Sequence, residues 1–154
     1  MPDTRKTPMA QQDACTLLDE DHNEVIRLFE QYKSAHDASR KRVLTRQICH
    51  ELQVHTRIED EIFYPAFRSA TGDQPVVDDA VHEHHEAAAL IARLEAAQVD
   101  DKLMLELEDL VLHHVNDERE KMFPEARKAR GMDLVQLAQQ LEARKAELTA
   151  AHPA

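Results

Sequence analysis

The stretch HTRIEDEIFYP, from His55 to Pro65, has a close counterpart later in the chain, HVNDEREKMFP, from His114 to Pro124. Both begin with His, carry Glu four residues later, and place two apolar or aromatic residues directly before a proline. Residues four apart share one face of an α-helix, so each copy sets an imidazole and a carboxylate one turn apart. The repetition predicts two equivalent helices that direct the same pair of side chains toward one place.

The composition of the chain favours helices throughout its length. The 154 residues include only 2 Gly and 6 Pro, and Ala, Leu, Glu, Gln, Lys and Arg are abundant. These abundant residues lose the least on entering a helix. With 42% hydrophobic residues, a chain of this length can bury a single core. We therefore predict an all-α fold.

The charge of the chain argues against several classes of binding partner, and its cysteine content argues against a disulfide-rich or zinc-ribbon protein. The formal net charge of −11 disfavours nucleic acid and anionic membranes, because both need a basic face that displaces counterions. Cys15 and Cys49 are too few and too irregularly placed for a disulfide framework or a zinc ribbon, which favours a reducing compartment. The sequence has no apolar run of about 18 residues and no signal-type segment after its polar start. It predicts a cytoplasmic protein without a membrane or nucleic-acid partner.

Apolar periodicity and helix breakers divide the chain into five predicted helices. We expect a disordered tail over residues 1–11, a bundle over residues 12–130, and a C-terminal helix and tail over residues 131–154. The predicted helices are Gln12–Ala35, Ala38–Ser69, Pro75–Ala97, Asp101–Ala129 and Leu134–Thr149. Because the connections are short, the first four should form an antiparallel up-down four-helix bundle. The fifth either covers the bundle or forms a homodimer contact, and the sequence leaves both open.

Each of the four bundle helices has a core-facing stripe that contains one histidine. The stripes are Leu18, His22, Val25, Phe29 and Tyr32; Ile48, Leu52, His55, Glu59, Ile62 and Ala66; Ala80, His84, Ala87, Ile91 and Leu94; and Leu107, Val111, His114 and Glu118. Lys121 falls in the fourth helix where the second helix has Ile62. The chain therefore has the pattern of a duplicated helical hairpin, whose halves should bring imidazoles and carboxylates together in one core.

Such a set of polar side chains in one core predicts a metal site, because a buried carboxylate without a partner is costly. Imidazole and carboxylate without thiolate suit iron, manganese or zinc, and six ligands are too many for one tetrahedral zinc. Two glutamates from opposite helices are placed to bridge two ions. We predict a dinuclear centre, with iron as the metal, whose ligands are His22, His55, Glu59, His84, His114 and Glu118.

The repeated motif, with DEDH at Asp19–His22 and EHHE at Glu83–Glu86, resembles the hemerythrin-like, or HHE cation-binding, domain family. The resemblance implies a four-helix bundle around a non-haem di-iron centre with an oxo or hydroxo bridge. It also implies the following ligand roles: His22 and His55 bind one iron, His84 and His114 bind the other, and Glu59 and Glu118 bridge them.

Two departures from the oxygen-carrying hemerythrins concern Ala80 and Glu118. The carriers have a further histidine at the position of Ala80, and their second bridge is usually an aspartate at a longer spacing. The chain is therefore similar to the broader HHE group, which is associated with iron binding, oxygen or nitric oxide sensing, and peroxide handling.

Other histidines compete with this ligand set. His82 and Glu86 have the same spacing as His55 and Glu59, but they lie about 160° around the helix from His84 and should face solvent. His85 and His113 lie about 100° from the ligand stripe, so a role in supporting the ligands stays open. The histidines predicted to lie on the surface are His36, His50 and His152.

Two function classes fit the predicted centre. The first is a non-haem di-iron protein that binds or reacts with a small diatomic or peroxide ligand: dioxygen, peroxide or nitric oxide. The second is a non-catalytic iron-binding module for storage, delivery or sensing. A ferritin-like carboxylate oxidase would use Glu-x-x-His, which occurs nowhere in the sequence. Cys15 is expected to be a small core residue, with redox sensing as its alternative.

Overall fold

The computed structural model describes residues 12–151, which are almost entirely helical and contain no strand. The predicted all-α fold is confirmed. The elements in chain order are α1 (Ala14–Ser34), α2 (Ala38–Ile58), η2 (Glu59–Phe63), α3 (Tyr64–Thr71), α4 (Gln74–Ala97), α5 (Asp101–Asp117), η3 (Glu118–Met122), α6 (Phe123–Lys128) and α7 (Leu134–Ala151). The predicted tail over residues 1–11 and the predicted surface residue His152 lie outside the described residues.

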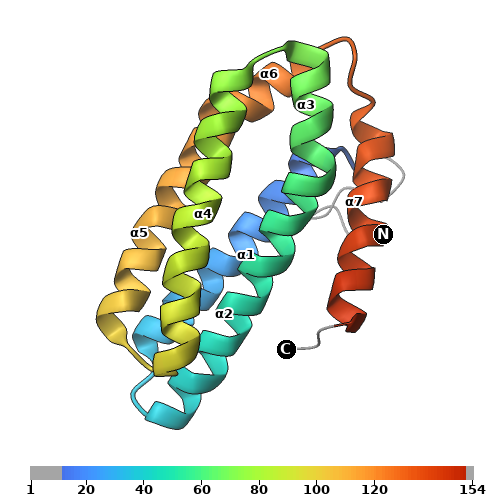
Figure 1. The fold of residues 1–154 in the computed structure, drawn as a ribbon. Helices are drawn as coiled ribbons and strands as arrows, with labels where there is room; N and C mark the ends of the chain where they lie inside the picture. Colours follow the sequence, from blue (N-terminus) through green and yellow to red (C-terminus); the bar gives the residue numbers. More distant parts are fainter. Residues whose placement is uncertain (1–11, 152–154) are drawn as a thin grey trace.

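Four rods form the bundle, and two of them are composite (Figure 1). One rod runs through α2, η2 and α3, and another runs through α5, η3 and α6. α1 packs along α2, and α4 packs along α5, so each half of the chain is a helical hairpin. The two hairpins meet through contacts of α2 with α4 and of α1 with α5. This is the predicted up-down four-helix bundle.

Aspartate side chains begin five of the helices. In each case the carboxylate accepts a hydrogen bond from the backbone N–H three residues later, at a position where a helix has no internal partner for that donor. The caps are Asp13, Asp37, Asp73, Asp100 and Asp133. At the other end of the α2–η2–α3 rod, Gly72 has a φ of 68°, which ends the helix in a left-handed conformation that favours glycine. These caps fix where each rod starts and therefore which residues meet in the centre.

The apolar core is divided into two clusters by a layer of polar side chains. Along α1, Leu18 belongs to one cluster and Val25 to the other, with His22 between them. The other rods show the same order, since Ala80 and Ala87 lie on opposite sides of His84. All six predicted ligands are buried in this layer, with exposed fractions between 0% for Glu59 and 8% for His114. Up to Glu59 and Glu118, the helices therefore turn the predicted residues toward the core.

After the glutamates, both composite rods contain one π-helical turn that the sequence analysis did not predict. The N–H of Tyr64 donates to the carbonyl of Glu59, five residues earlier, and Phe123 does the same with Glu118. Pro65 explains the widening, because its ring has no N–H and would clash with the carbonyl four residues before it. π-turns are rare, and they are frequently found at functional sites.

The extra residue in η2 rotates the following core stripe, which corrects one prediction. Ile62 and Ala66, predicted as core residues, are only half-buried. Phe63, Tyr64 and Phe67 are fully buried in their place. In the other rod the same shift buries Met122 and Phe123, and it leaves the side chain of Lys121 65% exposed. The lysine at a predicted core position is therefore on the surface.

α7 packs against the outside of the bundle, along α1, α2 and η2 (Figure 1). Its Ala138, Leu141 and Leu148 are buried in the cluster that also contains Leu18. The helix thus covers the bundle, and the homodimer contact stays a prediction.

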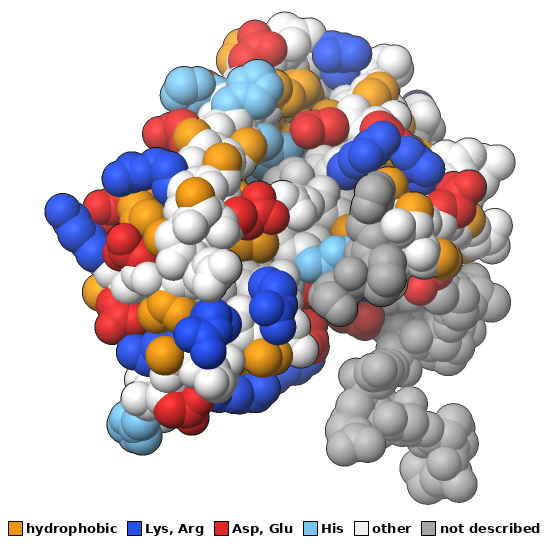
Figure 2. All heavy atoms as spheres, turned by 60° about the horizontal axis from the view of Figure 1, so that its bottom comes forward, with side chains coloured by type: hydrophobic (Ala, Val, Ile, Leu, Met, Phe, Trp, Pro, Cys, Tyr) orange, Lys and Arg blue, Asp and Glu red, His pale blue; other side chains and the backbone are white. Residues whose placement is uncertain are grey.

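Within residues 12–151, no helix is both long and apolar enough to cross a bilayer. On the face shown in Figure 2, acidic and basic side chains are interspersed, and the exposed hydrophobic side chains form only small patches.

Candidate metal centre

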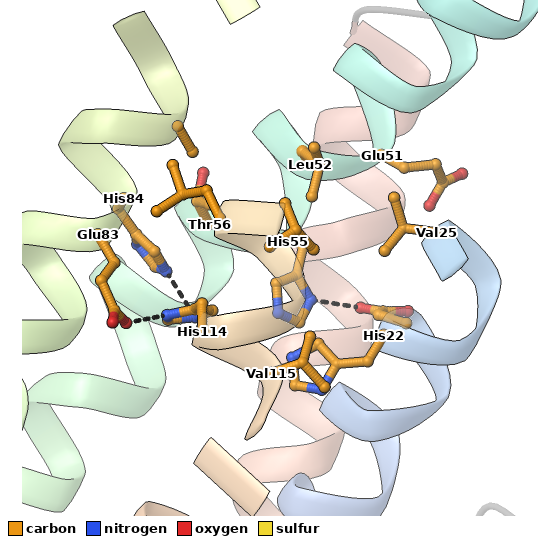
Figure 3. Close-up of a pocket in the computed structure, with 14 residues that line it drawn as sticks. His22, Val25, Glu51, Leu52, His55, Thr56, Glu83, His84, His114 and Val115 are labelled. Carbon is orange, nitrogen blue, oxygen red and sulfur yellow. Dashed lines mark hydrogen bonds and ion pairs between the residues drawn. The ribbon is translucent and has the colours of Figure 1, made fainter. Parts of the chain in front are cut away.

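In all four predicted histidine ligands, the same edge of the imidazole ring points into the centre. Their Nε2 atoms face inward, and each Nδ1 contacts a carboxylate at the rim. The pairs are His22 with Asp19 at 3.0 Å, His55 with Asp21 at 3.2 Å, His84 with Asp60 at 2.9 Å, and His114 with Glu83 at 2.7 Å. Figure 3 shows Glu83 and His114 in this arrangement. In a neutral imidazole, an Nδ1–H that donates to a carboxylate leaves the Nε2 lone pair turned toward the centre and available to a cation, which is the usual support of a metal-bound histidine.

The inward atoms form two groups that share Glu59. In the first, one ligand atom each from His22, His55, Glu59 and Glu118 lies within 4.8 Å of every other. In the second, ligand atoms of Glu59, His84 and His114 do the same. The structure therefore brings all six predicted residues together, and it divides the histidines into the two pairs expected from the resemblance.

Four atoms in this layer are fully buried and have no hydrogen-bond partner within residues 12–151. They are Nε2 of His22, Nε2 of His55, Oε2 of Glu59 and Oε1 of Glu118. His22 Nε2 lies 2.8 Å from Glu118 Oε1, but the two atoms are not oriented for a hydrogen bond. Buried polar atoms are almost always satisfied, so four unsatisfied polar atoms in one buried layer indicate a missing partner. Imidazole nitrogens and carboxylate oxygens fit a cation of the iron, manganese or zinc type.

The hydroxyl of Tyr64 reaches the middle of the centre. Its oxygen lies 2.8 Å from Glu118 Oε2, 3.1 Å from Glu59 Oε1 and 3.1 Å from His84 Nε2. Burial, together with the charges of Glu118 and Glu59, raises the pKa of Tyr64 well above its usual value. The phenol therefore stays protonated and donates to a carboxylate.

Electrostatics in the metal-free centre favour protonated histidines. Burial alone would lower the pKa of His55, but the charge of Glu59 and the hydrogen bond to Asp21 outweigh burial and raise this pKa to about 10. At His22, His84 and His114 burial would also lower the pKa. Hydrogen bonds to neighbouring carboxylates and the charges of those carboxylates outweigh burial, so these pKa values are raised as well. The pKa values of the two glutamates are lowered, because the facing imidazolium charges outweigh the effect of burial. Protons thus occupy the positions where a cation would otherwise balance the carboxylates.

A small cavity of about 30 Å³ opens among the four histidines (Figure 3). Its other walls include the apolar side chains of Val25, Leu52, Ala87 and Val111. One water needs about 10–15 Å³ of such space, so the cavity holds only a few non-hydrogen atoms. A separate groove of about 90 Å³ passes Ala80 and reaches His114 and Glu118 from the surface.

The competing histidines lie outside this centre. The side chains of His82 and His113 are 75% and 67% exposed, and His85 and His36 are exposed as well. His50, predicted on the surface, is half-buried. His113 Nε2 lies 3.4 Å from Glu83, the carboxylate that supports His114, whereas no such contact involves His85 among the described residues.

Cys15 is fully buried, as expected for a small core residue. Burial raises the pKa of its thiol to about 12, so the reactive thiolate is not populated at neutral pH. Cys15 and Cys49 are both free thiols.

Comparison with known proteins gives the family. The model of the hemerythrin HHE cation binding domain matches residues 13–126, which is most of the chain. The chain belongs to the hemerythrin HHE cation-binding family. The resemblance inferred from the sequence motifs is thereby confirmed, and the matched segment contains all six candidate ligands.

Two individual proteins are similar to this HHE domain. The crystal structure of a hemerythrin HHE cation binding domain-containing protein from Mycobacterium kansasii superposes with a TM-score of 0.80 at 22% identity, covering 92% of this chain and 90% of that one. A DNA nickase from Nostoc sp. (strain PCC 7120) is 28% identical over 108 residues, which make up 67% of this chain and 30% of the nickase. The HHE chain thus spans less than a third of that relative.

The acidic residues that contact the histidines of the HHE centre were not predicted from the sequence. Asp19 and Asp21 stand in the quoted DEDH motif, Asp60 follows Glu59, and Glu83 begins EHHE. In three of the motifs, an acidic residue stands close in sequence to a candidate ligand, and this proximity was the one sign of a supporting role. The partners could not be assigned from it, because Asp21 supports His55 and Glu83 supports His114, each on another helix.

Proposed function

We propose that the protein is a non-haem di-iron protein that binds or reacts with a small oxidant: dioxygen, peroxide or nitric oxide. The observation that carries the proposal is the set of unpartnered, fully buried nitrogen and oxygen atoms that converge between the four bundle helices. His22 and His55 would hold one ion, His84 and His114 the other, and Glu59 and Glu118 would bridge them. A bound iron pair supplies the electrons, or the site of attachment, that such oxidants need.

The protein's own groups select the class of ligand. The cavity of about 30 Å³ among the four histidines admits a molecule of only a few atoms. Part of the cavity wall is apolar, and the protonated Tyr64 supplies a hydrogen-bond donor beside the two carboxylates that would bridge the ions. The activity named for the Nostoc relative is not part of the proposal, because the match covers 30% of that protein. A net charge of −11 also disfavours binding to DNA.

The first test is the iron content of protein purified without added metal. We expect about two iron ions per chain, and at least one fewer in His55→Ala, because His55 Nε2 is one of the unpartnered atoms. His82→Ala is the matched control, since His82 has a glutamate at the same spacing but is 75% exposed. If His82→Ala empties the protein and His55→Ala leaves it full, the assignment of ligands is wrong.

Reaction with oxidants separates the proposed function from iron storage or sensing. The reduced, iron-loaded protein should be oxidised by oxygen or peroxide, and the oxidised form should bind azide, as followed by stopped-flow spectroscopy. A stable and reversible oxygen complex would instead indicate a carrier. Absence of any reaction with either oxidant would favour the storage or sensing module.

Ala80 provides a test of ligand access. Ala80 lines the groove that reaches His114 and Glu118, one turn from His84. Ala80→His would add a nitrogen donor there, and we expect azide to bind the oxidised protein several-fold more slowly. Ala80→Leu is the control, because it fills the same space without a donor. Equal slowing by both variants would mean that bulk alone matters and that no coordination position is open at this side.

A further inference from the structure

α7 lies outside the segment that matches the family model, yet one of its side chains reaches the candidate centre. Lys145 Nζ lies 2.7 Å from Oδ1 of Asp21, and Oδ2 of Asp21 lies 3.2 Å from Nδ1 of His55. On the opposite edge of the imidazole, His55 Nε2 lies 3.2 Å from Glu59. A continuous series of contacts therefore runs from the C-terminal helix to the carboxylate that both ligand groups share.

The position of Asp21 makes it dependent on this lysine. The side chain of Asp21 is only 9% exposed, and a carboxylate that is buried to this extent needs a charged or hydrogen-bonding partner. The Lys145 side chain is 31% exposed, so its ion pair with Asp21 is partly shielded from water. Without the ammonium group, Asp21 would be free to turn away from His55. The imidazole would then lose the contact that fixes its orientation.

The cationic partners of the supporting carboxylates lie on one side of the centre. Lys145 pairs with Asp21, and Arg119 Nε lies 2.6 Å from Asp19, the carboxylate behind His22. Asp60 and Glu83, behind His84 and His114, form no ion pair with a lysine or arginine in the described part of the chain. The two halves have the same ligand types but different surrounding charge. A positive charge close to a metal ion favours its lower oxidation state, by Coulomb's law.

We propose that Lys145 is a positioning residue of the metal centre. It holds Asp21 against His55, and its charge raises the reduction potential of the iron bound by His22 and His55 above that of the iron bound by His84 and His114. The inference rests on the proposed di-iron function. It makes α7 part of the metal centre as well as a cover for the bundle.

The experiment first compares three variants of the full chain loaded with iron. Lys145→Met removes the charge and keeps the apolar stem, Lys145→Arg restores the charge, and Arg144→Met is the matched control. Arg144 forms the neighbouring ion pair of α7, 2.8 Å from Glu61, which is not a candidate ligand. The readouts are the rate at which a chelator extracts iron from the reduced protein and the midpoint reduction potentials of the iron pair.

In Lys145→Met we expect about tenfold faster extraction of one of the two ions, at the lower end of the effect of removing an outer partner. One of the two potentials should fall. Lys145→Arg should restore both readouts, and Arg144→Met should match the unmodified protein. Asp21→Asn guards against a folding defect in the lysine variant, because in that background Lys145→Met should have no further effect on extraction.

Two outcomes have different meanings. If Lys145→Met and Arg144→Met change extraction equally and neither changes a potential, α7 is only a structural cover and the inference is wrong. If the unmodified protein holds no iron, the proposed function fails before the variants are compared.

Discussion

Removal of the metal is expected to lower the melting temperature of the protein by about 10 °C or more. A ligand at a thousand times its dissociation constant stabilises the folded state by about 4 kcal/mol. For a chain of this size, about 1 kcal/mol shifts the melting temperature by ~2–4 °C. Without metal, buried side chains such as Glu59, whose exposed fraction is 0%, lose the cation that would balance them. Calorimetry of the chelator-treated and the iron-loaded protein at pH 7 measures the difference.

The pH dependence of the metal-free form follows from the shifted pKa values. The raised histidine pKa values contribute stability that is fully present below the unfolded value of about 6.5, and it is lost as pH rises through the folded values. For His55 the folded pKa is about 10. The lowered pKa values of Glu59 and Glu118 contribute stability above about pH 4.5, which is lost as pH falls through the folded values. The metal-free protein should therefore be most stable between about pH 4.5 and 6.5 and less stable toward pH 9.

The iron-loaded form should change little in stability above neutral pH, because its metal-bound histidines are neutral, as they are in the unfolded chain at that pH. Metal must displace protons from the histidines, so apparent affinity rises as pH rises and the protons become easier to remove. The gap in melting temperature between the loaded and metal-free forms should widen from pH 6 to pH 9. A metal-free protein that is as stable as the loaded form at pH 7, with no change in the gap, would show that these side chains do not form a metal site.

How much of the centre follows from the sequence can be judged at the two glutamates. Up to Glu59 and Glu118, spacing places each predicted ligand in the buried centre, because an α-helix repeats regularly and the core stripe is continuous. Beyond them it fails, since one extra residue in each π-turn exchanges Ile62 for Phe63 and Tyr64 in the core. Pro65 was a visible sign of a break in the helix. What a proline does within a longer rod depends on packing against the other helices.

Tyr64 and Lys145 show a second reason why sequence falls short. Neither stands at a position that helical periodicity assigns to the centre, and Lys145 approaches from a helix outside the bundle. Their contacts with Glu118 and Asp21 span 54 and 124 residues of sequence. Such pairs are fixed by how the rods dock, which local patterns do not contain. Short-range regularity is therefore enough to bring the candidate ligands together and insufficient for the residues that contact them.

Glu59→Gln is expected to have the largest effect of any single substitution on metal content. Glu59 is the residue common to both ligand groups. Its Oε1 lies 3.0 Å from His84 Nε2 and 3.2 Å from His55 Nε2. Gln keeps the size of the side chain and one oxygen, but it removes the negative charge and places an NH₂ group among metal-binding nitrogens. We expect the iron content to fall from about two ions per chain to nearly none.

A variant of one histidine pair provides the contrast. His114→Ala removes a ligand from the second group alone, so it should retain about one ion, held by His22, His55 and the two glutamates. Elemental analysis and circular dichroism of both variants distinguish loss of metal from loss of fold. The metal-free Glu59→Gln protein should stay helical, because a histidine that loses the facing carboxylate can release its proton, so no unpaired charge stays buried. Retention of two ions in Glu59→Gln would show that Glu59 does not bridge, whereas equal loss of both ions in the two variants would mean that the ions bind only as a pair.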